Sequence, residues 1–193
     1  MDSKDVIYSF CQTLYNCTYL PIHYYQNGHL QLVLPDTGFP FDLAVPHLSE
    51  LVSKGLPISY LATNEFHYIG LVQNEKTEQM VLIGPVISIL PSPESIRNIM
   101  KEYAIPLEYR AHLTELYQFT PVYSFHQFCH FLALFYQELL HDVIDINAYL
   151  NVYTDTKSAS VASLHSSKSY DAKEMERFHN TYHYEQLYLD YIR

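Results

Sequence analysis

The chain of 193 residues has no tryptophan, only five glycines and only three cysteines. Because glycine is so scarce, no glycine-rich loop of the kind that cradles a phosphate is present. Cys11, Cys17 and Cys129 are odd in number and lack a CxxC spacing. We therefore expect no disulfide framework, and a reducing cytoplasm is the predicted compartment. The apolar runs are all shorter than the ~20 residues of a membrane-spanning helix, so no membrane partner is expected.

Basic residues are also scarce, with 11 Lys and Arg against 21 Asp and Glu and a formal net charge of −10. Binding to nucleic acids or anionic membranes requires clustered Lys and Arg, and the sequence has no such cluster. Hydrophobic residues make up 48% of the chain, enough for a folded core. The aromatic content is high, with 19 tyrosines and 10 phenylalanines beside 11 histidines.

The first two thirds of the chain predict an antiparallel sheet with helices around it. A helix is expected from Ser3 to Asn16, a loop over 35–46, and a short helix at His47–Lys54 that Gly55 could end. Five apolar, β-branched or aromatic runs predict strands: Ile22–Gln26, Leu30–Leu34, Ile58–Ala62, Phe66–Val72 and Met80–Ile89. Asn27-Gly28 predicts a tight hairpin between the first two strands, and Gln73–Gln79 predicts a turn between the last two.

Helices are predicted from Ser92 onward, so the expected class is α+β. Ser92-Pro93 is a helix start signal, and the prolines at 106 and 121 separate further helices at Leu107–Phe119 and Ser124–His141. The last of these carries an apolar stripe on one face, while Phe131 and Leu134 lie off that stripe. A helix that is apolar on two sides is buried or shared with a partner, so Phe131 and Leu134 are candidate dimer contacts.

Few residue patterns indicate catalysis or metal binding. His126 and His130 are four residues apart on a helix, a spacing that suits zinc, but the glutamate of HExxH is missing and no further ligand pair is evident. A structural role is the favoured interpretation, also for the similarly spaced His179 and His183. No GxSxG elbow is present and no cysteine has a catalytic context. We therefore predict no catalytic residue, no metal and no cofactor.

A ligand pocket is a more promising candidate, because tyrosine and histidine supply both apolar surface and polar groups. The candidates lie on predicted strands: His23, Tyr25, Phe66, His67, Tyr68 and Gly84. Gly84 within a strand indicates a bulge or a close backbone approach. The alternative for each of these side chains is that it fills the core between the sheet and the helices.

The C-terminal part divides into a polar stretch over 153–169, predicted to be a linker, and a predicted connecting helix over 170–193. Four side chains of this helix share one face and are candidate dimer or coupling contacts: Tyr184, Leu187, Tyr188 and Tyr191. The pattern stops without a cap at Arg193, which leads us to expect that another domain follows.

The order of these parts resembles the N-terminal sensory region of AraC-type transcription regulators from low-GC Gram-positive bacteria. The resemblance is carried by an IGPV-like strand at 83–86 and by a terminal segment with the pattern HNxYxxExxxLxxI. The matching positions of this segment are His179, Asn180, Tyr182, Glu185, Leu189 and Ile192. The resemblance implies a GAF/PAS-like sensor and dimerisation domain over 1–152. It also implies two helix-turn-helix units beyond Arg193, so that DNA would be bound only there.

The leading hypothesis is a non-catalytic, ligand-sensing and dimerising domain of such a regulator, with a small-molecule effector of unknown identity. The differential affinity of the effector for two states would shift the linker and the terminal helix. The first alternative is a protein-interaction module with a GAF-like fold and no small ligand. A second is a metal-dependent enzyme that uses His126 and His130.

Overall fold

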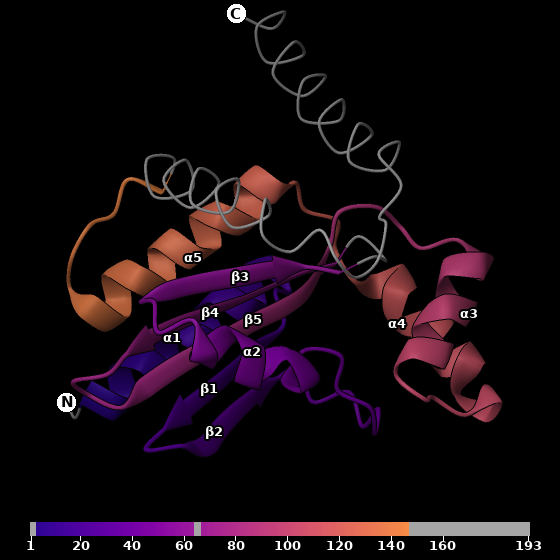
Figure 1. Ribbon diagram of the computed structural model, residues 1–193, viewed down its shortest axis with the longest axis horizontal. Coiled ribbons are helices and arrows are strands. Elements are labelled where there is room, and N and C mark those ends of the chain that lie inside the picture. Colours follow the sequence, from indigo (N-terminus) through magenta and orange to yellow (C-terminus); the bar gives the residue numbers. More distant parts are fainter. Residues whose placement is uncertain (1–2, 64–66, 147–193) are drawn as a thin grey trace, which may run out of the picture. The chain divides into compact units, whose positions relative to one another are not determined.

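The structure of the protein, a computed structural model, describes residues 3–63 and 67–146. These residues form an α+β fold with a five-stranded antiparallel sheet flanked by helices, which confirms the predicted class (Figure 1). The helices are α1 (Ser3–Thr18), α2 (Leu48–Ser53), α3 (Pro93–Glu102), α4 (Arg110–Phe119) and α5 (Phe125–Leu140), with 3₁₀ turns η1 (Val45–His47) and η2 (Leu107–Tyr109). The strands are β1 (Ile22–Gln26), β2 (His29–Leu34), β3 (Ile58–Ala62), β4 (His67–Asn74) and β5 (Gln79–Ile87).

The strand order is β2-β1-β5-β4-β3, so the first hairpin adds to the sheet beside β5. The β1–β2 hairpin turns at Asn27 and Gly28, whose φ angles are +52° and +72°. Positive φ at both central residues is the requirement of a tight turn that matches strand twist, and the Asn-Gly pair meets it at low cost. The predicted hairpin is therefore confirmed.

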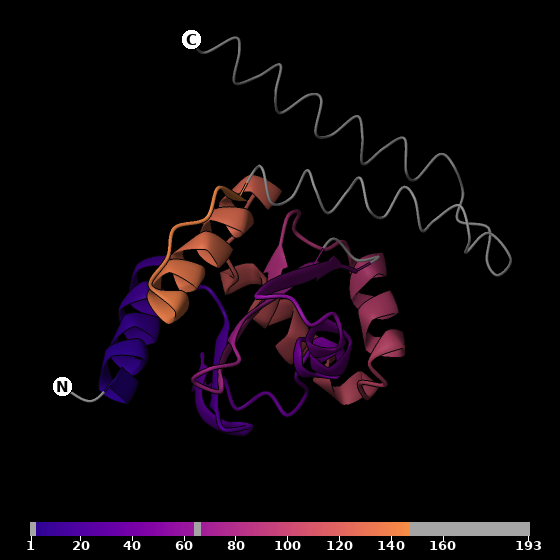
Figure 2. The ribbon, with the colours of Figure 1, turned by 60° about the vertical axis from the view of Figure 1, so that its left-hand side comes forward.

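Helices α1 and α5 cover one face of the sheet (Figure 2). They contact each other through Phe10 and Phe135, whose ring centroids are 5.3 Å apart. Helix α5 approaches β4 closely at Gly70, where a Cβ atom would lie 2.5 Å from a Leu132 methyl carbon and 2.8 Å from the Phe128 ring. The missing side chain of Gly70 thus makes room for two core residues of α5.

Helices α2, α3 and α4 lie on the other side of the sheet (Figure 2). Leu51 of α2 packs in a buried cluster with Tyr25, Ile69 and Leu82 of the sheet. A second cluster joins Ile87 at the end of β5 to Ile99 of α3 and to buried side chains of α4. Because successive side chains of a strand point to opposite faces, each strand contributes to both layers of core.

Capping residues set where α3 and α5 begin. The Ser92 hydroxyl accepts a hydrogen bond from the Ser95 N–H, and Pro93 occupies the first helical turn. Ser124 and Gln127 form a reciprocal capping box at the start of α5. These are the signals from which the sequence predicts both starts, and each satisfies N–H groups that the helix itself leaves unpaired.

Several predicted boundaries were wrong by a few residues, and two of them have a clear physical reason. The single helix expected at Leu107–Phe119 is a 3₁₀ turn, η2, followed by α4, because the chain leaves Pro106 in an extended conformation and tightens its first turn. Strand β4 continues through the expected turn residues Gln73 and Asn74. Their side-chain amides donate hydrogen bonds to the Leu56 and Leu139 carbonyls, so polar residues are accommodated inside the sheet.

The predicted linker over 153–169 and the connecting helix over 170–193 lie outside the described residues, as does Phe66. Within the described ranges, no helix combines the length and apolar character needed to cross a bilayer.

Candidate functional site

The candidate pocket residues divide between the two faces of the sheet. Tyr25 packs in a buried cluster with Leu51 of α2 and Leu82 of β5. His23 is paired with Leu82 across the β1–β5 ladder and therefore lies on the same face. His67 contacts Tyr117 of α4, which also belongs to this side. Tyr68 instead stacks on Phe128 of α5, with ring centroids 5.5 Å apart, and so lies on the opposite face. The structure therefore places His23, Tyr25 and His67 together on the face covered by α2, α3 and α4.

Gly84 interrupts β5 with a φ of +115°, and a Cβ atom there would lie 2.6 Å from the Tyr68 carbonyl oxygen. The register between β4 and β5 shifts over the same stretch, between Tyr68 and Gly70. The bulge and the close approach that the sequence predicts at Gly84 are thus present. They serve the backbone geometry of the sheet.

His67 is the most enclosed polar side chain on this face, with 1% of its surface exposed. Its Nε2 atom lies 3.0 Å from the Tyr117 hydroxyl, and the two rings are stacked at an interplanar angle of 14°. This pair connects the first residue of β4 to α4. Its second ring nitrogen, Nδ1, is buried and has no hydrogen-bond partner among the described residues.

Burial lowers the pKa of His67 to about 4, and the nearby charge of His47 acts in the same direction. The ring is therefore neutral at pH 7, with one nitrogen that donates and one that accepts. Whichever tautomer pairs with Tyr117, Nδ1 is left as an unpaired donor or acceptor. An unsatisfied buried group of this kind costs about 1–3 kcal/mol. A polar atom that reached Nδ1 would recover that free energy.

His47 and Tyr103 form a second histidine–tyrosine pair beside the first. His47 Nε2 lies 2.8 Å from the Tyr103 hydroxyl and joins the end of η1 to the C-terminus of α3. Burial, with the charge of Glu102, raises the pKa of Tyr103 to about 12, so its hydroxyl keeps its proton at pH 7. The two pairs together hold η1, α3 and α4 around His67. We define this group of His47, His67, Tyr103 and Tyr117 as the histidine–tyrosine cluster.

A third contact on this face joins His23 to Asp42. The His23 Nε2 atom lies 2.6 Å from Asp42 Oδ2, and the other carboxylate oxygen accepts hydrogen bonds from the Ala44 and Val45 N–H groups. Burial acts to raise the pKa of Asp42, but the hydrogen bond and charge of His23, with the two N–H groups, lower it overall. Asp42 thereby fastens the start of η1 to β1. The Nδ1 atom of His23 is also buried without a partner among the described residues.

Sequence reasoning missed Asp42, His47, Tyr103 and Tyr117. In the sequence, His47 stands at the start of one predicted helix and Tyr117 lies within another. Their contacts with the histidines span 50 and 56 residues of chain. No local spacing encodes such contacts. The one available signal was the presence of several histidines in otherwise apolar segments.

The chemical groups of this site suit binding better than covalent chemistry. Burial raises the pKa of Cys11 and of Cys129 to about 12, so both thiols are protonated and poor nucleophiles at pH 7. Within the described part of the chain, no three His, Cys, Asp or Glu side chains are grouped so as to hold a metal ion. The neutral imidazole of His67 and the tyrosine hydroxyls remain, and these groups donate and accept hydrogen bonds.

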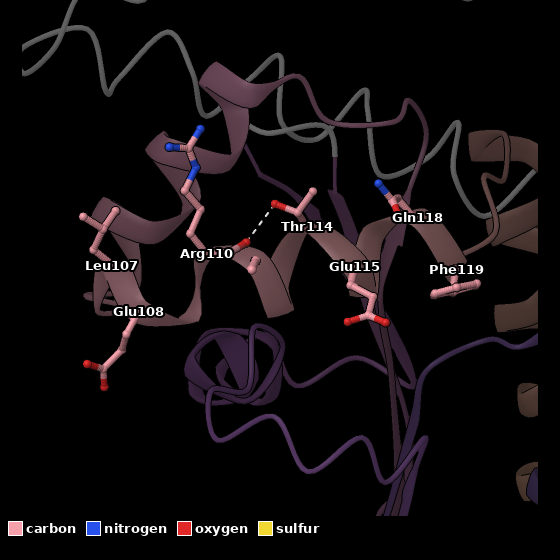
Figure 3. A pocket seen from close by; sticks show the side chains of 8 residues that line it. Leu107, Glu108, Arg110, Thr114, Glu115, Gln118 and Phe119 are labelled. Carbon is pink, nitrogen blue, oxygen red and sulfur yellow. Dashed lines mark hydrogen bonds between the residues drawn. The ribbon is translucent and has the colours of Figure 1, made fainter.

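Two surface hollows lie away from the histidine–tyrosine cluster. One, of about 670 Å³, runs along α4, and its side chains lie in a row without converging on one point (Figure 3). Among them are Leu107 and Phe119, which are 75% and 77% exposed. The other, of about 280 Å³, lies beside α5 and includes His130 and Leu134. Neither hollow contains a predicted pocket residue.

The predicted dimer contacts are differently placed. Phe131 is buried and meets Tyr123 edge-on, with ring centroids 5.0 Å apart. Leu134, in contrast, is 43% exposed. Tyr184, Leu187, Tyr188 and Tyr191 lie outside the described residues. Of the predicted contacts that the structure describes, Leu134 is the one on the surface.

Comparisons with protein-family models, with curated proteins and with solved structures gave no match in any of the three.

Proposed function

We propose that this domain is a non-catalytic sensor that binds a small molecule at the histidine–tyrosine cluster. The observation that carries the proposal is the buried, unpaired Nδ1 atom of His67. Buried polar groups in folded proteins nearly always have partners, so each exception needs a cause. A ligand with a hydrogen-bonding atom opposite Nδ1 supplies that cause, because binding would satisfy the nitrogen.

The elements around His67 provide a path from the site to α5. The chain leaves α4 at Thr120, and the following segment is fastened to β5 by a bridge between Val122 and Ile87. The Tyr123 N–H donates to the Ile87 carbonyl, and the Tyr123 hydroxyl donates to the Thr18 carbonyl at the end of α1. A ligand that changed how α4 rests on His67 would thus act on the segment that begins α5.

The output that we propose is control of transcription, on the strength of the resemblance to AraC-type sensory regions. In this proposal two copies associate, and the state of the cluster sets the geometry of the DNA-binding units that would follow Arg193. The α+β fold is compatible with the GAF/PAS-like domain that the resemblance implies. Ligand binding drives the change only if the ligand has different affinities for the two states.

A thermal-shift screen with sugars and other metabolites tests the proposal. A ligand present at 100 times its dissociation constant adds about 2.7 kcal/mol to the free energy of unfolding, which is a readily measured shift. We expect a compound that raises the unfolding midpoint of the wild type but not that of His67→Phe. His29→Phe is the matched control, because His29 is exposed on β2 and should leave the response unchanged. A hit that shifts both variants equally would place binding elsewhere.

Exposed apolar residues of η2 and α4 favour a second candidate function, a protein-interaction module. Leu107 and Phe119 lie at opposite ends of one surface hollow (Figure 3) and expose most of their side chains to solvent. Large exposed apolar side chains that share a surface mark interaction sites in many proteins. This candidate predicts no response across the metabolite screen, together with a partner whose affinity falls in Leu107→Ser and Phe119→Ser.

A further inference from the structure

The outer side of α5 carries two histidines that take no part in the core. The capping box fixes the start of the helix at Phe125, so His126 lies in the first turn and His130 one turn later. Residues four apart on a helix are neighbours on its surface. Both rings are exposed, while Phe128, Cys129 and Leu132 of the same helix are buried. The pair therefore lies on the surface and is not part of the buried core.

The two imidazoles present their Nε2 atoms to each other at 2.9 Å, with the rings perpendicular and their centroids 4.5 Å apart. A metal ion binds an imidazole nitrogen at about 2.0–2.1 Å. Two nitrogens 2.9 Å apart that share one ion at this bond length subtend an angle of about 90° at the metal. This is the angle between neighbouring ligands in square-planar or tetragonal coordination, which Cu²⁺ and Ni²⁺ adopt.

We infer that His126 and His130 form a surface site for a divalent transition-metal ion of the Cu²⁺ or Ni²⁺ type. Imidazole suits both ions, and affinity for a given nitrogen site is greatest for Cu²⁺ among the first-row divalent metals. A tetrahedral ion such as Zn²⁺ would need a wider separation of the two nitrogens. The structure thus favours Cu²⁺ first, then Ni²⁺.

The surroundings make this an open site with two protein ligands. Cys129 is adjacent in sequence, but its side chain is 1% exposed and buried in the core, away from the exposed histidines, so it is not a ligand of this site. The described residues provide no third His, Cys, Asp or Glu at this place. Water or an exogenous donor fills the remaining positions. Such a site exchanges its ion readily, because only two protein bonds hold the metal.

In the absence of metal the short contact is a hydrogen bond between the rings, with one Nε2 donating to the other. A bound ion replaces this single bond by two metal–nitrogen bonds. It thereby links the first two turns of α5, the helix that packs on Gly70 of β4. Because metal binds the folded helix better than the unfolded chain, it should raise the unfolding midpoint. This effect does not depend on a ligand at His67.

The test is a titration of the full chain with Cu²⁺ and, separately, Ni²⁺, in a buffer that does not chelate either ion. We expect one ion bound at this site, nitrogen coordination in the Cu²⁺ electron paramagnetic resonance spectrum, and a rise in the unfolding midpoint. Loss of even an outer-shell partner weakens metal binding about 10–100-fold, so His126→Ala and His130→Ala should each weaken it about tenfold or more. Both side chains are exposed, so circular dichroism without metal should show the variants folded.

Two further variants make the test specific. His29→Ala removes a single exposed histidine on β2 and should bind Cu²⁺ as the wild type does. The chain has a second pair with the same spacing, His179 and His183, so the binding is also measured in His179→Ala/His183→Ala. Binding that persists in this variant and disappears in His126→Ala/His130→Ala supports the inference. Unchanged Cu²⁺ affinity and nitrogen coupling in His126→Ala/His130→Ala would overturn it.

Discussion

Among the described residues, polar side chains buried on the face of the sheet under α1 and α5 have hydrogen-bond partners, whereas two imidazole nitrogens on the face under α2, α3 and α4 have none. On the first face the Gln79 amide donates to the Tyr24 hydroxyl and the Asn74 amide donates to the Leu139 carbonyl, among aliphatic and aromatic contacts. On the second face, Nδ1 of His23 and Nδ1 of His67 are unpaired. Both faces pack a buried core, but only the second leaves hydrogen-bonding atoms of buried side chains without a partner among the described residues.

Truncation of a core side chain on the α5 face should have the largest effect on stability. Phe128 is fully buried against Gly70 and Tyr68. Phe128→Ala should lower the free energy of unfolding by about 3–5 kcal/mol, because it removes buried apolar surface and leaves a cavity. Phe119→Ala makes the same change at a side chain that is 77% exposed and should cost at most about 0.5 kcal/mol. Urea unfolding of both variants measures the difference, and equal losses would contradict this packing.

A methyl group at Gly70 should also act through α5. Gly70→Ala forces Leu132 and Phe128 away from β4, and overpacking of this kind costs about 1–3 kcal/mol. In Gly70→Ala/Leu132→Ala the smaller side chain leaves room for the new methyl group. The two losses in urea unfolding should therefore sum to more than the loss in the double variant. Simple additivity would show that Gly70 and Leu132 are not in contact.

On the other face, removal of one partner of the His67–Tyr117 hydrogen bond should cost more stability than removal of both partners. Tyr117→Phe removes the hydroxyl that pairs with His67 Nε2 and should lower the free energy of unfolding by about 1–3 kcal/mol. In His67→Phe/Tyr117→Phe both polar groups are replaced by apolar rings of similar shape, and stability should return close to that of the wild type. Chemical denaturation of the wild type and both variants measures their relative stabilities. A double variant that is less stable than Tyr117→Phe alone would contradict the unpaired state of Nδ1.

Acid should destabilise the fold through His67 within a defined pH window. Its pKa is about 4 in the folded chain against an ordinary value of 6.5, so the unfolded state binds the proton first. Stability is unaffected by this group above pH 6.5 and falls as the pH drops from about 6.5 to about 4, by at most about 1.4 kcal/mol per pH unit. His67→Phe should remove this part of the slope between pH 6.5 and 5. An unchanged slope would show that His67 titrates normally.

Asp42 should also make the free energy of unfolding fall as the pH falls, but over a lower pH range than His67. Its pKa is lowered in the folded chain, so its contribution is present above the ordinary value of 3.8 and is lost as the pH falls through its folded pKa. Acid unfolding of Asp42→Asn compared with the wild type should therefore differ in shape only below about pH 4. A change in shape confined to pH 5–6 would assign the effect to another group.

The sequence predicted the features that depend on neighbouring residues. The hairpin at Asn27-Gly28 and the starts of α3 and α5 follow from local backbone requirements, and the structure has all three. The division of His67 and Tyr68 between two faces also follows from strand alternation. Because adjacent residues of a strand point to opposite faces, the prediction of one pocket that contains both side chains was wrong.

The remainder of the candidate site required tertiary structure. Tyr117 is a helical stripe residue in sequence, and only the packing of α4 on β4 brings its hydroxyl to His67. Likewise, Asp42 lies in a loop whose course to β1 no periodic pattern encodes. Whether a buried atom such as His67 Nδ1 has a hydrogen-bond partner depends on the packing of the folded interior, so no sequence pattern predicts it.

Histidine-selective ¹⁵N NMR with a compound from the thermal-shift screen tests whether a small molecule binds at His67. The compound should shift the Nδ1 resonance of His67 as this nitrogen acquires a hydrogen-bond partner. The resonances of His126 and His130, on the outer side of α5, should stay in place. A saturating compound that leaves the His67 ring nitrogens unchanged would contradict the claim.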